Sequence, residues 1–137
     1  MSVLELERAL QTMPQAVCPV RWYFAPGMAA REMLIPAGTV LTGAVHKTEH
    51  LNTISQGRIW VTTDNGVMEI RAPFTMVSSI GTKRAGFALE DTVWTTYHAT
   101  DETDPDKLVE LLTESKASEL LGGPQNLQLQ NEMKVIV

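Results

Sequence analysis

The three histidines of this chain, His46, His50 and His98, are the side chains best suited to metal chemistry. Imidazole is a good ligand for zinc, iron, nickel and copper, and a catalytic metal site usually needs three protein ligands and an open position. Residues four apart on a straight strand lie about 13 Å apart, so His46 and His50 can share an ion only where the chain turns between them. Glu49 can replace one ligand if the strand register slips by one residue. These four residues form the candidate set for a divalent transition metal.

A second candidate chemistry is the binding of an anion by the basic pair Lys83-Arg84. A guanidinium is a poor companion for a metal cation, whereas its planar fork of N–H donors suits a carboxylate or a phosphate. Adjacent residues on a strand face opposite sides, so we expect only one of this pair to point into a site. Thr48 and Asn52 lie an even number of residues from the first two histidines, so on a strand they face the same side. They join the site if that side is the inner one. The candidate ligand-binding residues are His46, Thr48, His50, Asn52, Lys83 and Arg84.

Composition and charge indicate one ordinary globular domain and exclude several classes of partner. Of the 137 residues, 44% are hydrophobic and 20% are charged. The net charge of −5 argues against a nucleic-acid polymer as a partner. No stretch has the apolar length of a membrane span, and the acidic residues of the N-terminal segment lead us to expect no export signal. The single cysteine, Cys18, excludes an internal disulfide and fits the reducing cytoplasm.

Two short helices are predicted, one towards each end of the chain. Ser2 and Glu5 have the spacing of a capping box, which indicates an N-terminal helix over 1–14. An Asp-Pro pair, an N-cap candidate followed by proline at the first helical position, begins a second helix over 104–121. The remaining residues, 122–137, form a Gln/Asn-rich tail that is expected either to be disordered or to add a strand to a neighbouring subunit.

Between these helices, over 20–100, short strand-like segments alternate with turn residues. Asn65-Gly66 is a strong hairpin signal, because both central residues of a type I′ turn need positive φ. Several short strands without intervening helices predict a sandwich or a barrel in a single domain. The predicted strands are 21–24, 31–35, 40–46, 57–63, 67–71, 74–80 and 92–100.

Glycines flank the first two histidines at the spacing of a known motif. The segment from Gly38 to Gly57 resembles the first cupin motif, G-x5-H-x-H-x3-E-x6-G, with His46 at its second histidine position. Ala44 stands where the motif has its first histidine, and His50 stands where it has its glutamate. The frame of the motif is therefore kept while its ligands are changed, which predicts a departure from the usual metal chemistry.

The second cupin motif, G-x5-P-x-G-x2-H-x3-N, falls on the segment that starts at Pro73 and places its metal histidine at Arg84. Of its other positions, only the middle glycine, Gly81, is kept. Over 35–100 the chain thus resembles the RmlC-like cupin family. The resemblance implies an all-β, cupin-like double-stranded jelly-roll barrel, with the two short helices added at its ends.

Three further segments, 48–52, 81–86 and 91–104, look like parts of small cupin-like proteins encoded by tailed phages and prophages. This resemblance implies that the protein acts in the cytoplasm of an infected bacterium. Cupins include dioxygenases, isomerases, sugar epimerases and plain ligand-binding proteins. The epimerase branch uses a histidine base without a metal, so an enzyme remains possible even without an ion.

Three hypotheses remain open. The first is a small-molecule-binding cupin, metal-free or weakly metal-binding, that recognises a polar or anionic ligand through His46, His50 and Arg84. The second is a metal-dependent cupin enzyme of the dioxygenase or isomerase type, with His46, His50 and either His98 or Glu49 around the ion. The third is a structural jelly roll without a site. In each case we expect a homodimer, because cupin sheets leave exposed edges and two-fold dimers are the commonest oligomers.

Overall fold

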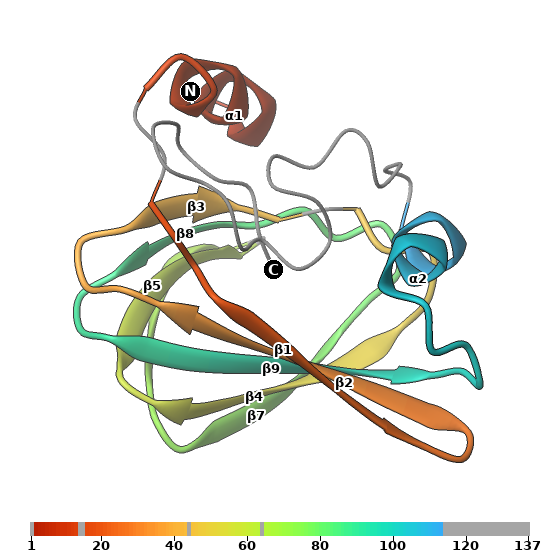
Figure 1. The fold of residues 1–137 in the computed structure, drawn as a ribbon. Helices are drawn as coiled ribbons and strands as arrows, with labels where there is room; N and C mark the ends of the chain where they lie inside the picture. Colours follow the sequence, from red (N-terminus) through yellow and green to blue (C-terminus); the bar gives the residue numbers. More distant parts are fainter. Residues whose placement is uncertain (1, 14–15, 44, 64, 114–137) are drawn as a thin grey trace.

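In a computed structural model that describes residues 2–13, 16–43, 45–63 and 65–113, the chain forms nine strands and two short helices (Figure 1). The elements in chain order are α1 (Val3–Leu10), β1 (Val20–Ala25), β2 (Met28–Ile35), β3 (Val40–Thr42), β4 (His50–Gln56), β5 (Arg58–Thr63), β6 (Gly66–Arg71), β7 (Phe74–Ser78), β8 (Ala85–Ala88), β9 (Thr92–Ala99) and α2 (Pro105–Leu112).

The strands form two antiparallel sheets that face each other (Figure 1). One sheet has five strands in the order β1-β2-β9-β4-β7, and the other has four in the order β3-β8-β5-β6. The chain passes repeatedly between the sheets, so neighbouring strands such as β4 and β9 are far apart in the sequence. This arrangement confirms the predicted fold class, a mostly-β jelly-roll barrel with two short helices.

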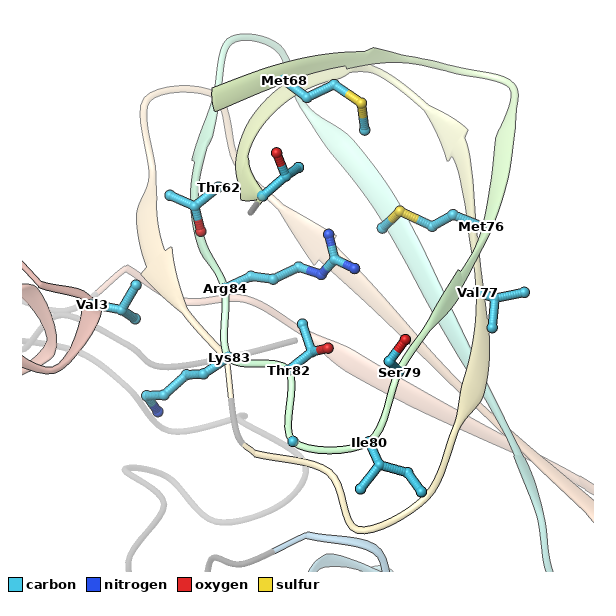
Figure 2. Close-up of a pocket in the computed structure, with 12 residues that line it drawn as sticks. Val3, Thr62, Met68, Met76, Val77, Ser79, Ile80, Thr82, Lys83 and Arg84 are labelled. Atoms are coloured by element: carbon cyan, nitrogen blue, oxygen red, sulfur yellow. The ribbon is translucent and has the colours of Figure 1, made fainter. Parts of the chain in front are cut away.

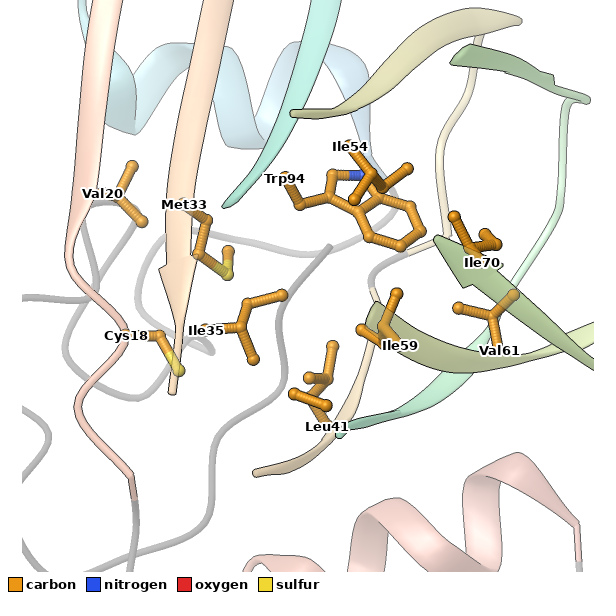
Figure 3. Packing of buried hydrophobic residues seen from close by; sticks show 11 residues of the cluster. Cys18, Val20, Met33, Ile35, Leu41, Ile54, Ile59, Val61, Ile70 and Trp94 are labelled. Carbon is orange, nitrogen blue, oxygen red and sulfur yellow. The ribbon is translucent and has the colours of Figure 1, made fainter. Parts of the chain in front are cut away.

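The space between the sheets is filled by one hydrophobic cluster (Figure 3). Alternate residues of a strand face opposite sides, so each strand contributes its inward positions to this cluster. Cys18 lies fully buried within it, as expected for a small apolar side chain. The buried members are Cys18, Val20, Met33, Ile35, Leu41, Ile54, Ile59, Val61, Ile70, Ala88 and Trp94.

The inner faces of β4 and β9 change from apolar to polar along their length. Ile54 of β4 pairs with Trp94 of β9 in the core, and Asn52 pairs with Thr96 one step further along. The next inward position on each strand is a buried histidine. The candidate site therefore lies above the hydrophobic core, at one end of the barrel.

Gly57, the last glycine of the motif frame, is required by packing. Its φ is +92°, and a Cβ on this residue would lie 2.3 Å from the carbonyl oxygen of Asp91. The Asp91 carboxylate in turn accepts the N–H of Ala37 at 2.8 Å, next to the turn that precedes β3. The motif glycine thus has a structural role that does not depend on a metal ion.

Both helices are present with the predicted start signals. Ser2 Oγ accepts the N–H of Glu5 at 3.1 Å, and the Glu5 carboxylate accepts the N–H of Ser2 at 2.8 Å, which completes the capping box. At α2, the side chain of Asp104 accepts the N–H of Asp106 at 3.0 Å. Neither of the described helices has the length and apolar character of a membrane span. The predictions for 114–137 lie outside the described residues.

The strand predictions miss two strands and misplace the ends of others, since β2 begins at Met28 rather than at 31 and β7 ends at Ser78 rather than at 80. The sequence pattern misses β4, because its inward positions carry His50 and Asn52, polar residues that break the hydrophobic alternation. It also misses β8, whose sequence Ala-Gly-Phe-Ala has a low strand propensity. The strand predicted over 40–46 is too long, because β3 ends at Thr42.

Candidate functional site

Three histidine rings meet at one end of the barrel. The ring centroids of His46 and His50 are 4.1 Å apart, and each lies 5.5 Å from that of His98. All three residues are buried, with at most 8% of their surface exposed. They meet because the chain bends over 47–49, just before β4 begins. The structure thus supplies the turn that two histidines four residues apart need in order to converge.

The C-terminal end of α2 contacts the segment that carries the first histidine of this cluster. The backbone N–H of Lys47 donates to the carbonyl of Leu112 at 2.7 Å, and the Lys47 ammonium donates to the carbonyl of Glu110 at 2.9 Å. These carbonyls belong to the last turn of the helix, where no intrahelical N–H reaches them. Next to this contact, His46 forms an isolated β-bridge with Thr113. The segment before β4 and the end of α2 therefore hold each other in place.

Two of the three histidines are held in the neutral form. Burial lowers the pKa of His98 to about 4, with smaller contributions from His50 and Arg31. Burial also lowers the pKa of His50; the hydrogen bond between its Nδ1 and the Thr48 carbonyl raises it, and the Arg84 guanidinium lowers it further. The effect of Arg84 on His50 indicates that the guanidinium lies within electrostatic reach of the cluster.

The histidine cluster does not fit a metal ion as it is arranged. A metal needs several nitrogen lone pairs aimed at one point, which short distances between ring centres do not guarantee. The rings of His46 and His98 are stacked, with planes 18° apart. Among the described residues, no three His, Cys, Asp or Glu side chains are placed to hold a metal ion. Glu49, the candidate replacement ligand, lies exposed in the bend.

A buried polar network connects the core to the site. The fully buried Asn52 accepts hydrogen bonds from the Trp94 indole N–H and the Thr96 hydroxyl, both at 3.0 Å. Its amide donates to the hydroxyl oxygen of Ser78 at 2.9 Å, and the same oxygen accepts a bond from Arg84 Nη2 at 3.3 Å. Buried polar groups are costly unless they are paired, so the side chains of this network are held in fixed positions. Ser78 thereby orients the Arg84 guanidinium from the side of the hydrophobic core.

Lys83 and Arg84 point in different directions (Figure 2). The Lys83 ammonium lies 2.7 Å from the carboxylate of Glu7 in α1 and donates to the carbonyl of Gly43 at 2.6 Å. The same carboxylate accepts the hydroxyl of Thr42 at 2.8 Å. Arg84 extends instead into a pocket of the barrel (Figure 2). One residue of the pair thus faces inward, and it is the arginine.

The pocket around Arg84 has a volume of about 790 Å³ and is lined by the segment 79–84, by residues of β5, β6 and β7, and by Val3 of α1. Of the twelve described residues that line it, two are basic and none is acidic. Beneath Arg84 the barrel is packed, with a remaining cavity of only about 10 Å³. The lining residues that matter most for chemistry are Thr62, Met68, Met76, Ser79, Thr82 and Arg84.

Of the six candidate ligand-binding residues from the sequence, Lys83 and Arg84 line this pocket and the other four do not. Thr48, like Glu49, is exposed in the bend, and only its carbonyl contacts the site, through His50. His50 is the strand partner of Ser78, whose hydroxyl binds Arg84, so the histidine cluster adjoins the pocket across these two residues. The structure therefore shows two neighbouring features, a neutral histidine cluster and a basic pocket.

Most of the residues that line the pocket were not candidates in the sequence, and neither was Ser78, which binds Arg84. Ser78 and Met76 lie on the inner face of β7, and their equal parity on a predicted strand is a signal that could have identified them. Met68 gives no such signal, because most of β6 is exposed. Its place in the pocket depends on the way the two sheets meet.

No family model and no curated protein matches this chain. Solved structures do match it. KdgF from Halomonas sp. is similar with 14% identity and a TM-score of 0.53, over 63% of this chain and 83% of that chain. The Cnp3 cupin domain of Schizosaccharomyces pombe is similar with 17% identity and a TM-score of 0.52, over 63% of this chain and 67% of that chain.

An acetylacetone dioxygenase from Acinetobacter johnsonii is also similar, with 14% identity and a TM-score of 0.53, over 65% of this chain and 64% of that chain. These structural neighbours are proteins of the cupin superfamily. At such low identity the likeness shows the fold, which is a cupin-like jelly roll, and leaves the activity to be argued from the site.

Proposed function

We propose that this protein is a small-molecule-binding cupin whose pocket takes a polar or anionic ligand at Arg84. The observation that supports this most is the direction of the Arg84 guanidinium, which extends into a pocket without an acidic lining residue among those described. A guanidinium offers five N–H donors in a planar fork that matches a carboxylate or a phosphate. The hydrogen bond to Ser78 uses one nitrogen and holds the group in the pocket.

The neighbouring histidines do not line the pocket and carry no charge that would oppose an anionic ligand there. His50 and His98 are neutral at pH 7, and a neutral ring can donate one N–H to a bound anion. The volume of about 790 Å³ falls in the range of ligand pockets, which supports a binding role over a purely structural jelly roll.

A thermal-shift comparison tests this function. Wild-type protein is heated with and without inorganic phosphate, benzoate and acetate at constant ionic strength, alongside Arg84→Gln and Arg71→Gln. Arg71 is an exposed arginine on the outside of β6, so its variant is the matched control for loss of one positive charge. We expect at least one anion to raise the melting temperature of the wild type and of Arg71→Gln but not of Arg84→Gln. Equal shifts in all three proteins, or none, would refute the proposal.

A metal-dependent enzyme of the dioxygenase or isomerase type is the second candidate. It is favoured by the compactness of the histidine cluster and by the buried Nδ1 of His98, which has no hydrogen-bond partner among the described residues. The stacking of the rings speaks against it. Elemental analysis of untagged protein, with a His46→Ala, His50→Ala double variant, separates the two functions. About one metal per chain, lost in the double variant, would favour the enzyme.

We further propose a homodimer that forms through the outer face of the five-stranded sheet. A row of residues crosses all five strands there in direct register: Val77, Leu51, Tyr97, Ala30 and Tyr23. Val77, Leu51 and Tyr23 are each about half exposed, which is unusual for a contiguous apolar row. Light scattering should give a dimer for the wild type and for Val67→Lys on the other sheet, and a monomer for Leu51→Lys. A monomeric wild type would contradict this.

The finer identity of the protein is also a proposal. The resemblance of three sequence segments supports an RmlC-like cupin of phage origin that acts in the cytoplasm of an infected bacterium. The single buried cysteine is compatible with that reducing compartment. Detection of the protein in the soluble fraction of infected cells, and its absence from purified virions, would support this setting.

A further inference from the structure

We propose that the ligand of the Arg84 pocket is a planar aromatic molecule with one anionic group, such as an aryl carboxylate or a nucleoside monophosphate. This inference rests on the proposed function and specifies the class of its ligand. It depends on two methionines, Met68 of β6 and Met76 of β7, which line the pocket together with Arg84 (Figure 2).

The two thioethers give the pocket walls that suit a flat ring. Met68 comes from the edge strand of one sheet and Met76 from the edge strand of the other, so the two thioethers enter the pocket from different sheets (Figure 2). Thioether sulfur is polarizable and makes favourable contacts with aromatic rings, and the flexible side chain adapts to the shape of a ligand. Met68 remains 37% exposed, which leaves part of its surface for a ligand to cover.

The arrangement of residues along β7 allows one ligand to bring both its ring and its anionic group into contact with the protein. Met76 lies two residues before Ser78 on the same face of the strand, and the Ser78 hydroxyl holds Arg84. Residues two apart on a strand face the same side, so one ligand can contact the Met76 thioether with its ring and the guanidinium at Ser78 with its charged group.

The charge of the pocket indicates one anionic group rather than several. Lys83 is paired with Glu7 and donates to the carbonyl of Gly43, and it points away from Arg84 (Figure 2). The pocket therefore presents one guanidinium. One carboxylate or one phosphate matches it, whereas a polyphosphate would bring further charges, and the other cation of the described lining, Lys83, is already paired with Glu7.

The test is calorimetric titration with two matched pairs of probes. The first pair is 2-naphthoate and its fully saturated analogue, decahydro-2-naphthoate, which differ in aromaticity and flatness. The second pair is AMP and ribose 5-phosphate, which share a phosphate and differ by the base. We expect the aromatic member of at least one pair to bind at least about five-fold more tightly than its partner, given the size of sulfur–aromatic contacts. Preference for AMP over naphthoate would indicate a nucleotide, and the reverse an aryl carboxylate.

Two methionine variants connect this preference to the pocket. Met68→Leu and Met76→Leu keep the side-chain volume and remove the sulfur. Each should lower the affinity for the aromatic probe by about two- to twelve-fold without lowering the affinity for its non-aromatic partner. Met28→Leu, at a half-exposed methionine of β2, is the matched control and should change neither of these two affinities.

Failure of this inference can be told apart from failure of the proposed function. Equal binding within both pairs, or an aromatic preference that survives both methionine variants, overturns the aromatic ligand while Arg84-dependent anion binding still stands. If inorganic phosphate and all four probes bind no more tightly to the wild type than to Arg84→Gln, both proposals fail.

Discussion

Trp94 donates its indole N–H to the side-chain oxygen of Asn52 at 3.0 Å, at the level where the hydrophobic core ends and the polar site begins. Both residues are buried, and both lie on the inner faces of paired strands. The other end of the Asn52 amide reaches Ser78 and, through it, Arg84. The guanidinium of the pocket is thus positioned by a hydrogen-bonded chain that begins in the core.

Asn52→Ala is therefore expected to lower stability. The change leaves the indole N–H of Trp94 and the hydroxyls of Thr96 and Ser78 without their buried partner, at a cost of about 2–4 kcal/mol. Ser55→Ala, at an exposed position of the same strand, is the control and should cost less than about 0.5 kcal/mol. Urea unfolding followed by tryptophan fluorescence measures both. Similar midpoints for the two variants would show that the network contributes little.

Gly57→Ala and Gly27→Ala form a second matched pair. Both glycines have positive φ, so each change costs about 1–2 kcal/mol of backbone strain. Only at Gly57 would the new Cβ also collide with backbone, 2.3 Å from Asp91 O, whereas nothing lies within 4 Å at Gly27. We expect Gly57→Ala to be less stable than Gly27→Ala by at least about 1–3 kcal/mol, or not to fold. Equal unfolding midpoints would contradict the close packing of this turn.

Acid is expected to destabilise the protein through its buried histidines. An unfolded His98 takes up a proton near pH 6.5, whereas the folded residue does so only at about pH 4. Because the folded pKa is the lower one, the stabilisation is complete above pH 6.5 and is lost as the pH falls towards 4. The loss amounts to about 3 kcal/mol. His50, whose pKa is also lowered, acts in the same direction.

The control for this pH dependence is His98→Gln. Its free energy of unfolding should fall less steeply than that of the wild type between pH 6.5 and pH 4, since one titrating group is removed. Denaturant titrations at several pH values give both slopes. Parallel curves would mean that His98 titrates normally in the folded protein and is not held neutral by burial.

The fold was predictable because its signals are local in the sequence. Glycines at turns, the capping pair of Ser2 with Glu5, and short apolar alternations each depend on a few neighbouring residues. The polar strand β4 was not predictable in this way. Asn52 is tolerated inside the barrel because Ser78, Trp94 and Thr96, which lie 26, 42 and 44 residues further along the chain, satisfy its hydrogen bonds.

The site shows the same division between local and distant information. Spacing identified the histidine pair and the basic pair, and parity indicated that one of Lys83 and Arg84 faces inward. Which one does so depends on Glu7, a residue of the N-terminal helix that draws the lysine away. The thioether of Met68 could not be assigned to the pocket, because its position depends on how the two sheets meet.

Lys83→Met should separate stability from binding. The change removes the partner of Glu7, whose carboxylate is only about one-fifth exposed, so we expect a loss of about 1–3 kcal/mol in the free energy of unfolding. Anion affinity should stay within about two-fold of the wild type, because Lys83 points away from the ligand. A large loss of affinity with little loss of stability would place the ligand at Lys83 instead.

The most direct test of the central claim is a calorimetric titration of wild type, Arg84→Gln and Arg84→Lys with whichever of phosphate and benzoate stabilises the wild type. Loss of a charged hydrogen-bonding partner should weaken binding at least about ten-fold in Arg84→Gln. Arg84→Lys should restore it only in part, since an ammonium lacks the planar fork. Affinities that are equal in all three proteins would contradict an anion site at Arg84.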